Sequence, residues 1–237
     1  MKSSVDEWSK NYDHVDIENR IMSLIAKKII NNLKGPQVLI LGYAHDDWPE
    51  ICSDLCDHID IVEGSIDHCE HGIQRFKESS HICLHHCLFE EYESKILYDT
   101  VIAGSVIELF KNPHDFLSLV KSWMKPHGNL ILTTPNRNSL HRRIGYYMGI
   151  ERNTRELNKR AHLTGAVKLY DRIDLMNVLI ESDLCIHEIK GMFLKPLSND
   201  QMRNFDQSLL EGLMEVGYEL GSDICKELIA ICTKSAQ

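Results

Sequence analysis

No stretch of this 237-residue sequence approaches the roughly 18 consecutive apolar residues of a membrane-spanning helix. The opening residues MKSSVDEWSK are polar and lack the apolar core of a secretory signal. Basic residues are also scarce, since 26 Lys and Arg stand against 35 Asp and Glu, which gives a net charge of -9. These absences predict a cytoplasmic protein with no membrane partner, and they argue against general binding to nucleic acid.

The separated ligand pairs typical of a structural zinc site are missing as well. Eight Cys and thirteen His are present, but they are scattered or fall in single clusters such as HICLHHC at residues 81–87. On a strand, Cys83, His85 and Cys87 would share one face. The cysteines would then serve as small apolar residues of a buried strand. We therefore expect no bound metal, and cysteines in the reduced state usual for cytosolic proteins.

Internal repeats and low-complexity linkers are absent, which predicts one domain over residues 1–237 with an N-terminal helical segment at 1–34. Short apolar runs that suit buried strands alternate with stretches that suit helices. The predicted strands cover about 38–41, 59–62, 81–87, 98–103, 129–133, 184–193 and 227–233, and the predicted helices about 15–33, 46–56, 67–77, 112–124, 171–182 and from 199 through 213. This alternation predicts an α/β fold with a mostly parallel sheet.

The loop after the first strand has a single glycine, Gly42, where a dinucleotide-binding loop of the GxGxxG type needs two more. Ala44 and Asp47 occupy those positions, and acidic side chains disfavour a pyrophosphate. Glu63 ends the second strand about 20 residues later, where an acid can accept hydrogen bonds from a ribose diol. A cofactor with a ribose but no phosphates, such as S-adenosylmethionine, fits this unit. The alternative is an ordinary strand-helix-strand unit without a ligand.

The alternation stops after Thr134-Pro135-Asn136, where the sequence becomes basic. Residues 137–168, called the basic segment below, hold eight Arg and Lys against two Glu in an otherwise acidic chain. Two interpretations stay open at this point. The segment is either a solvated helical excursion or a lid insertion, over about 136–168, that presents cations to an anionic substrate.

Four motifs, in this order, resemble those of class I S-adenosylmethionine-dependent methyltransferases. They are VLILGYA from residue 38, IDIVEGS from residue 59, YDTVIAGSVIELFKNP from residue 98 and LVKSWMKPHGNLILTTPN from residue 119. The resemblance spans about 11–233 and implies a Rossmann-like seven-stranded sheet with helices on both faces and an antiparallel last strand. Three features depart from the family pattern. The glycine-rich loop is reduced to one glycine, Gly42; Leu109 replaces the histidine of the VLEH motif; and His127 replaces the first glycine of the PGG motif.

The resemblance also implies a set of cofactor-binding positions for S-adenosylmethionine. They are Tyr12, Gly42, Tyr43, Glu63, Gly64, Ser65, Leu88, Phe89, Glu90, Gly104, Ser105 and Val106. Gly42 and Tyr43 would line the methionine side, and Glu63 would hold the ribose hydroxyls. Residues 88–90 would flank the adenine, and residues 104–106 would lie beside the sulfonium.

The stretch after the fifth strand resembles the helical lid of small-molecule methyltransferases. The candidate substrate-binding residues are Arg142, Arg143, Tyr146, Tyr147, Tyr170 and Lys195, and the candidate catalytic bases are His141 and, second to it, His162. This predicts O- or N-methylation of a small acceptor that is anionic.

Two alternatives to this enzyme remain open in the sequence. One is a catalytically degenerate member of the same fold that acts by binding a partner. The other is a macromolecular methyltransferase. The acidic composition disfavours RNA or DNA as its substrate, and the sequence GSVI after the fourth strand, in place of an Asn-Pro-Pro-Tyr type of motif, disfavours methylation of base amines. The oligomeric state is left open, with a homodimer as one option.

Overall fold

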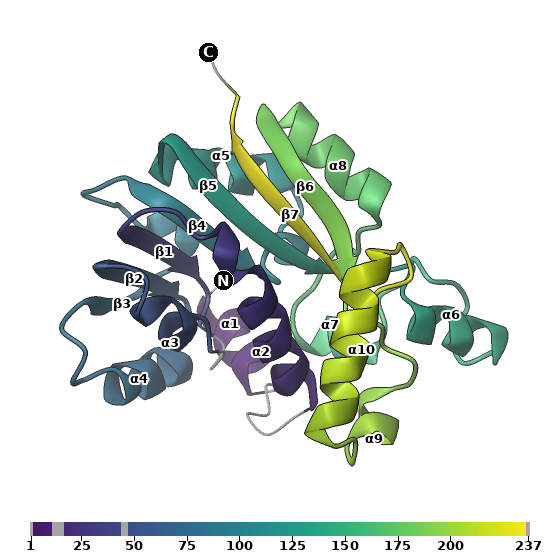
Figure 1. The fold of residues 1–237 in the computed structure, drawn as a ribbon. Coiled ribbons are helices and arrows are strands. Elements are labelled where there is room, and N and C mark those ends of the chain that lie inside the picture. The colour runs from purple at the N-terminus through teal and green to yellow at the C-terminus, as the bar shows by residue number, and fades with distance from the viewer. Residues whose placement is uncertain (1, 11–16, 44–46, 236–237) are drawn as a thin grey trace.

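Seven strands form one sheet in the order β3-β2-β1-β4-β5-β7-β6 (Figure 1). The computed structural model describes residues 2–10, 17–43 and 47–235. The strands are β1 Gln37–Leu41, β2 His58–Glu63, β3 Ile82–His86, β4 Tyr98–Gly104, β5 Met124–Pro135, β6 Leu184–Met192 and β7 Glu227–Lys234. The first five pair in parallel, and β7 runs antiparallel to both of its neighbours. The predicted fold class is therefore confirmed.

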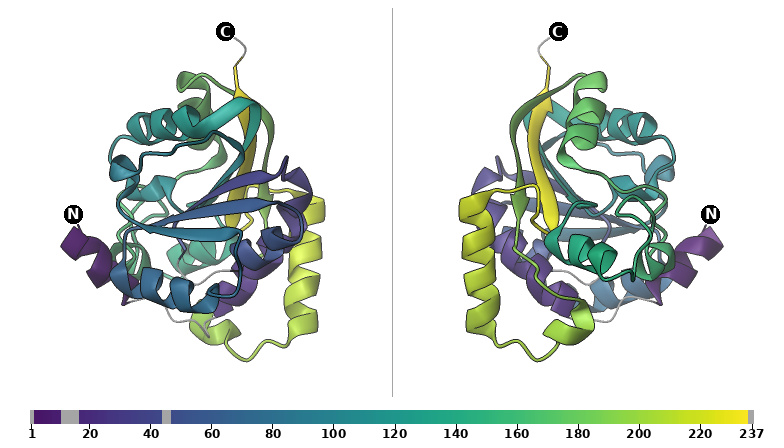
Figure 2. Two further views of the ribbon diagram at one scale, coloured as in Figure 1. Left: turned by 90° about the vertical axis from the view of Figure 1, so that its left-hand side faces the viewer. Right: turned by 90° about the vertical axis from the view of Figure 1, so that its right-hand side faces the viewer.

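Helices cover both faces of this sheet. They are α1 Lys2–Ser9, α2 Ile17–Ile29, α3 Trp48–Ser53, α4 Ile66–Arg75, α5 Pro113–Trp123, α6 Leu140–Tyr147, α7 Lys159–Leu163, α8 Arg172–Glu181, α9 Asn199–Met202 and α10 Gln207–Leu220, with short 3-10 turns η1 Ile30–Asn32, η2 Phe89–Glu91 and η3 Ile107–Leu109. In Figure 2, α10 lies on one side of the sheet and α5 on the other. No helix in the described ranges is long and apolar enough to cross a bilayer.

The alternating direction of the side chains along each strand explains why the protein has two hydrophobic cores, one on each face of the sheet. Ile40 is in register with Ile61 and Ile102, and all three pack into the core formed with α2, α3 and α10. Their strand neighbours Leu41 and Val62 face the opposite core, which includes α5 and α8. Because successive side chains of a strand point to opposite faces, continuous apolar runs bury both faces at once.

Two predicted elements have different bounds in the structure. The single helix predicted from residue 199 through 213 is wrong, because Asp206 accepts a hydrogen bond from the Leu209 N–H at 2.8 Å and begins a second helix there. The fifth strand starts earlier than predicted. Met124 pairs with Tyr98 before residues 125–128 bulge out, with His127 at φ +64°, and pairing resumes at Asn129.

Candidate active site

A cavity of about 690 Å³ lies at the carboxyl ends of the parallel strands. Loops that follow β1, β2, β3, β4 and β5 contribute to its wall, as expected where parallel strands end together. Helices α1, α2 and α6, the segment around α7, and the stretches before β7 and after β6 complete the lining. The basic segment follows the carboxyl end of β5 and carries α6 and α7 (Figure 1). One cavity therefore joins the predicted cofactor loops to the predicted substrate segment.

Glu63 is held rigidly at the wall of this cavity. Its Oε2 accepts the Tyr43 N–H at 2.8 Å, and its Oε1 accepts the Ser65 N–H at 2.6 Å. Burial alone would raise the pKa of Glu63, but hydrogen bonds from His68 and from these two N–H groups outweigh it and lower the pKa. Glu63 is consequently an ionised acceptor with a fixed direction.

Two glycines leave backbone exposed to the cavity. Gly42 has φ +80°, a conformation that disfavours any residue with a side chain. A Cβ on Gly104 would lie 3.2 Å from Trp48 Nε1, closer than ordinary contact. The chain after β1 and the chain at the end of β4 can therefore both approach a ligand through main-chain atoms.

The structure places most of the cofactor-binding positions implied by resemblance on this cavity. Those on its wall are Gly42, Glu63, Gly64, Ser65, Leu88, Phe89, Glu90, Gly104, Ser105 and Val106. Tyr43 is not among the lining residues, because its side chain is buried in the core, where its hydroxyl accepts from Arg75 at 3.0 Å and lies 3.2 Å from His71. Its backbone serves the site instead, through the hydrogen bond to Glu63. Tyr12 lies outside the described residues.

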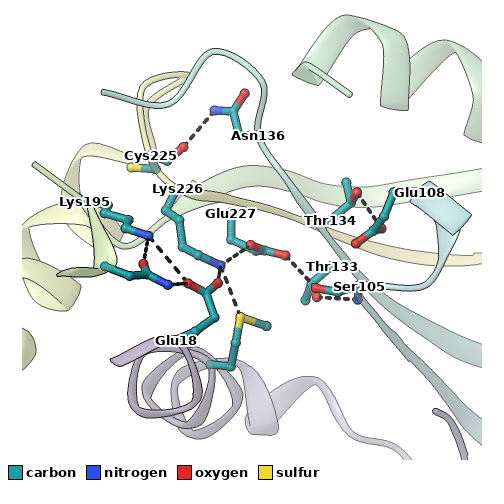
Figure 3. A network of polar contacts seen from close by, with 12 residues as sticks. Glu18, Ser105, Glu108, Thr133, Thr134, Asn136, Lys195, Cys225, Lys226 and Glu227 are labelled. Atoms are coloured by element: carbon teal, nitrogen blue, oxygen red, sulfur yellow. Dashed lines mark hydrogen bonds and ion pairs between the residues drawn. The ribbon is translucent and has the colours of Figure 1, made fainter. Parts of the chain in front are cut away.

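A buried network of charged groups borders the cavity through Glu18, Lys195 and Lys226, and Figure 3 shows its contacts. The Lys226 Nζ lies 2.5 Å from Glu18 Oε1 and 2.7 Å from Glu227 Oε2. Glu227 in turn accepts a hydrogen bond from the Ser105 hydroxyl at 3.1 Å. Lys195 donates to Asn199 and lies 3.5 Å from Glu18 Oε2. The network thus connects the loop after β4 to helix α2 and to the chain after β6.

Four of these charged residues were missed by reasoning from sequence. Glu18, Glu108, Lys226 and Glu227 are all less than a fifth exposed and belong to the network or the wall beside it. One local signal was present for Glu227, because it adjoins an apolar strand as Glu63 does, although it begins β7 whereas Glu63 ends β2. Glu18 and Glu108 offered no comparable pattern.

His141 is the predicted catalytic base that lines the cavity. Burial, and then the cations Lys195, Lys226 and Arg142, lower the pKa of His141 to about 3 although Glu18 opposes them. Its Nδ1 is buried and has no hydrogen-bond partner in the described part of the chain. His162 is exposed and is not among the lining residues.

The two adjacent arginines of α6 point in different directions. Arg142 is buried, and its guanidinium donates to the carbonyl oxygens of Thr154 and Glu156 at 3.2 and 2.7 Å and pairs with Glu151 at 3.1 Å. Arg143 is exposed and donates to the Asn138 carbonyl. Arg142 therefore orders the basic segment more than it offers a free cation.

The remaining substrate-binding candidates divide in the same way. Lys195 lines the cavity and is 5% exposed. Tyr146 and Tyr147 are exposed on α6, away from the lining residues, and Tyr170 is fully buried without reaching the cavity wall. Of the six predicted substrate-binding residues, Arg142 and Lys195 are those that line the cavity.

Elemental analysis of the purified protein is expected to find no stoichiometric zinc. Within the described ranges, no group of three or more Cys, His, Asp or Glu has the arrangement of a metal site. Asp60 has two histidines beside it, but His58 Nε2 and His85 Nε2 lie 2.8 and 2.5 Å from its oxygens and the Tyr98 hydroxyl donates to it as well. One zinc per chain after dialysis against a chelator would contradict this prediction.

A family model described as a methyltransferase domain matches residues 12–184, well over half of the chain. Among curated proteins, the ubiquinone biosynthesis O-methyltransferase of Rickettsia akari is 30% identical over 117 residues. That match covers 47% of this chain and 43% of the relative, so the chain matches less than half of the relative's length.

Solved structures share the fold at low sequence identity. The N-methyltransferase NodS from Bradyrhizobium japonicum, in complex with S-adenosylhomocysteine, has a TM-score of 0.57 at 13% identity, over 92% of this chain and 87% of that one. Geranyl diphosphate C-methyltransferase from Streptomyces coelicolor has a TM-score of 0.59 at 15% identity, over 89% and 77%. With the matched domain, the sheet order and the strand-end cavity in agreement, the chain belongs to the methyltransferase-domain family of class I S-adenosylmethionine-dependent enzymes.

Proposed function

We propose that this protein transfers a methyl group from S-adenosylmethionine to a hydroxyl or amine of a small anionic molecule, with both ligands in the cavity at the strand ends. The observation that carries the proposal is a single cavity lined by two chemically different groups of residues. The first group is Glu63 with the glycines Gly42 and Gly104, and the second is His141 with Lys195. A donor and an acceptor of a methyl group need such adjacent sites.

The first group of residues fits the cofactor. Each Glu63 oxygen already accepts one N–H, which leaves further lone pairs for the two ribose hydroxyls. Leu88 and Phe89 provide apolar surface for the adenine. Gly42 and Gly104 allow the chain to lie close to the methionine part. When bound, the cofactor supplies an electrophilic methyl group on a sulfonium.

Lys195 supports an anionic acceptor. Its ammonium is buried at the cavity wall and shares Glu18 with Lys226, so two cations compete for one carboxylate. Burial lowers the pKa of Lys195, while the charge of Glu18 partly restores it. A phosphate or carboxylate bound there would satisfy an ammonium that the protein compensates incompletely.

An anionic acceptor would also improve His141 as a base. The imidazole is neutral at pH 7 and its Nδ1 has a free lone pair or proton, yet a pKa near 3 makes it a poor proton acceptor. Part of that depression comes from Lys195 and Lys226. An anion that offsets these cations raises the proton affinity of His141, which then accepts the hydroxyl or ammonium proton of the acceptor.

Titration calorimetry and a substrate screen test this function together. S-adenosylhomocysteine is expected to bind with one site per chain, because the cavity has one acidic clamp. Incubation of metabolite pools with S-adenosylmethionine labelled in its methyl group is expected to label anionic compounds of low molecular mass. Absence of binding by either form of the cofactor would refute the proposal.

The acceptor site is tested by Lys195→Met, which keeps the apolar stem and removes the charge. The KM of the acceptor is expected to rise about 10- to 100-fold, the range for losing a charged hydrogen bond. The affinity for S-adenosylhomocysteine should stay within about twofold, since Glu63 is on other loops. Arg143→Ala is the matched control, because Arg143 is exposed and should leave KM unchanged. A neutral acceptor with normal KM in Lys195→Met would contradict the anionic assignment.

A further inference from the structure

Glu108 is a buried carboxyl group on the cavity wall for which the reaction outlined above has no use. It lies in η3, three residues after Ser105, and is 4% exposed. One of its oxygens accepts a hydrogen bond from the Thr134 hydroxyl at 2.9 Å. No Lys, Arg or His in the described ranges forms an ion pair with it, so its negative charge would be uncompensated.

The charged neighbour that acts most strongly on Glu108 is another buried acid, Glu227. Glu227 is completely buried, and Lys226 is shared between Glu227 and Glu18. The ionisable side chains that interact electrostatically with Glu108 are Glu227 and Lys226 at β7 and Tyr170 after α7. The backbone N–H of Lys168 donates to the Glu108 carbonyl, and His141 of α6 lines the same cavity. Burial, and then the charge of Glu227, raise the pKa of Glu108 to about 8, and the more distant charge of Lys226 only partly opposes them. Glu108 itself therefore lacks a cation that balances its charge, although Lys195 and Lys226 line the same cavity.

We propose that Glu108 distinguishes the methyl donor from its demethylated product by charge: it is protonated in the empty cavity and in the product complex, and ionised in the donor complex. The proposal rests on the proposed function, since it takes the cofactor to lie against residues 104–106. Ser105 links the cofactor-binding loop to the acids near Glu108, because Ser105 lines the cavity and its hydroxyl donates a hydrogen bond to Glu227.

The two ligands differ by one methyl group and by one positive charge, and a carboxyl group can respond to that charge. The donor carries a positive sulfonium, whereas the product carries a neutral thioether. A cation beside a buried carboxyl favours its ionised form. The Glu108 O–H bond then breaks and the proton goes to solvent as the donor binds. After the methyl group has left, the site loses one positive charge and Glu108 takes a proton back from solvent.

The sign of the pH dependence follows from linkage. Below a pH of about 8, Glu108 is mostly protonated in the free protein, so donor binding must release a proton. Donor affinity should rise by up to about tenfold per pH unit towards that value and then level off. Product binding involves no such release, and the product is expected to be displaced more easily as the pH rises to 8.

Calorimetry in buffers of different ionisation enthalpy measures the protons released on binding. At pH 7 the wild type should release close to one proton more with S-adenosylmethionine than Glu108→Gln does, and both proteins should give equal counts with S-adenosylhomocysteine. The ligand's own amino group contributes identically in the two proteins, so their difference isolates Glu108. Gln keeps the acceptor for Thr134 and the shape of the side chain. Glu219→Gln, at an exposed site on α10, should match the wild type.

Infrared difference spectroscopy on the wild type gives a second measurement that needs no variant. The C=O stretching band of a protonated carboxyl group should disappear when S-adenosylmethionine binds and persist when S-adenosylhomocysteine binds. Equal proton counts in wild type and Glu108→Gln, or a band that behaves alike with both ligands, would overturn the inference and leave the proposed function intact. Failure of both ligands to bind would overturn both.

Discussion

Glu63→Ala is expected to weaken the binding of both S-adenosylmethionine and S-adenosylhomocysteine by about 1.5–3 kcal/mol, the range for hydrogen bonds to a charged group. That corresponds to roughly a 10- to 150-fold rise in Kd. The reason is that Glu63 is the ionised acceptor which two backbone N–H groups aim into the cavity. Calorimetry with S-adenosylhomocysteine measures the loss without the need for an acceptor.

The same substitution should also reduce stability, because it leaves the N–H groups of Tyr43 and Ser65 without their acceptor. We expect a loss of about 1–3 kcal/mol in the free energy of unfolding. Glu63→Gln retains one acceptor oxygen and separates the effects: it should be more stable than Glu63→Ala while still binding the cofactor weakly. Glu70→Ala, at an exposed position of α4, is the neutral control. Unchanged affinity in Glu63→Ala would show that another group holds the ribose.

Lys226→Met is expected to lower the free energy of unfolding by about 3–5 kcal/mol, the range for removing one partner of a buried ion pair. Glu18 and Glu227 would then lie close together in the interior without the ammonium that separates them. Chemical denaturation followed by circular dichroism measures the change. Lys28→Met is a matched control, because Lys28 pairs with Glu215 at 2.7 Å on the surface and should cost no more than about 1 kcal/mol.

The loss in Lys226→Met should depend on pH with a definite sign. In the wild type, burial would raise the pKa of Glu18, but Lys226 and Lys195 lower it well below its usual value, so its stabilisation is present above the unfolded pKa of about 4.5. In the variant Glu227 loses its ammonium and Glu18 keeps the more distant Lys195, so the pKa of both carboxyl groups is higher than in the wild type and the stability lost to the substitution grows as pH rises above that value. The gap between the two proteins should therefore widen from pH 5 to pH 7. A loss equal to that of Lys28→Met at pH 7 would contradict the buried ion-pair assignment.

Much of the fold followed from local patterns in the sequence. Short apolar runs identified every strand of the sheet, because a strand buried on both faces is a short continuous apolar segment. Glu63 could be found for the same reason, since the glycine loop, the helix and the acidic strand end are consecutive in the chain. The break between α9 and α10 was missed because Met202, Phe205, Leu209 and Leu213 keep helical spacing across it, and only the Asp206 cap interrupts the helix.

Side-chain direction was harder to predict than position. Tyr43 follows Gly42 directly, but its ring turns into the core and leaves only its N–H at the site. Arg142 and Arg143 are neighbours in sequence and differ completely in exposure, because successive helical residues point about 100° apart. A sequence motif can locate a segment at the site, but it does not predict which side chains of that segment reach the cavity.

The sequence by itself determined the α/β fold class, the methyltransferase family and the presence of Glu63 at the strand-end cavity, because each depends on motifs of residues close together in the chain. Only the tertiary structure decided which charges compensate one another. Ser105 and Glu227 are 122 residues apart and share a hydrogen bond, and Glu18 and Lys226 come from opposite ends of the chain. Burial and Coulomb energy depend on distance through space and on the exclusion of water, so the network around Glu108, and the proton it is proposed to release, exist only in the folded protein.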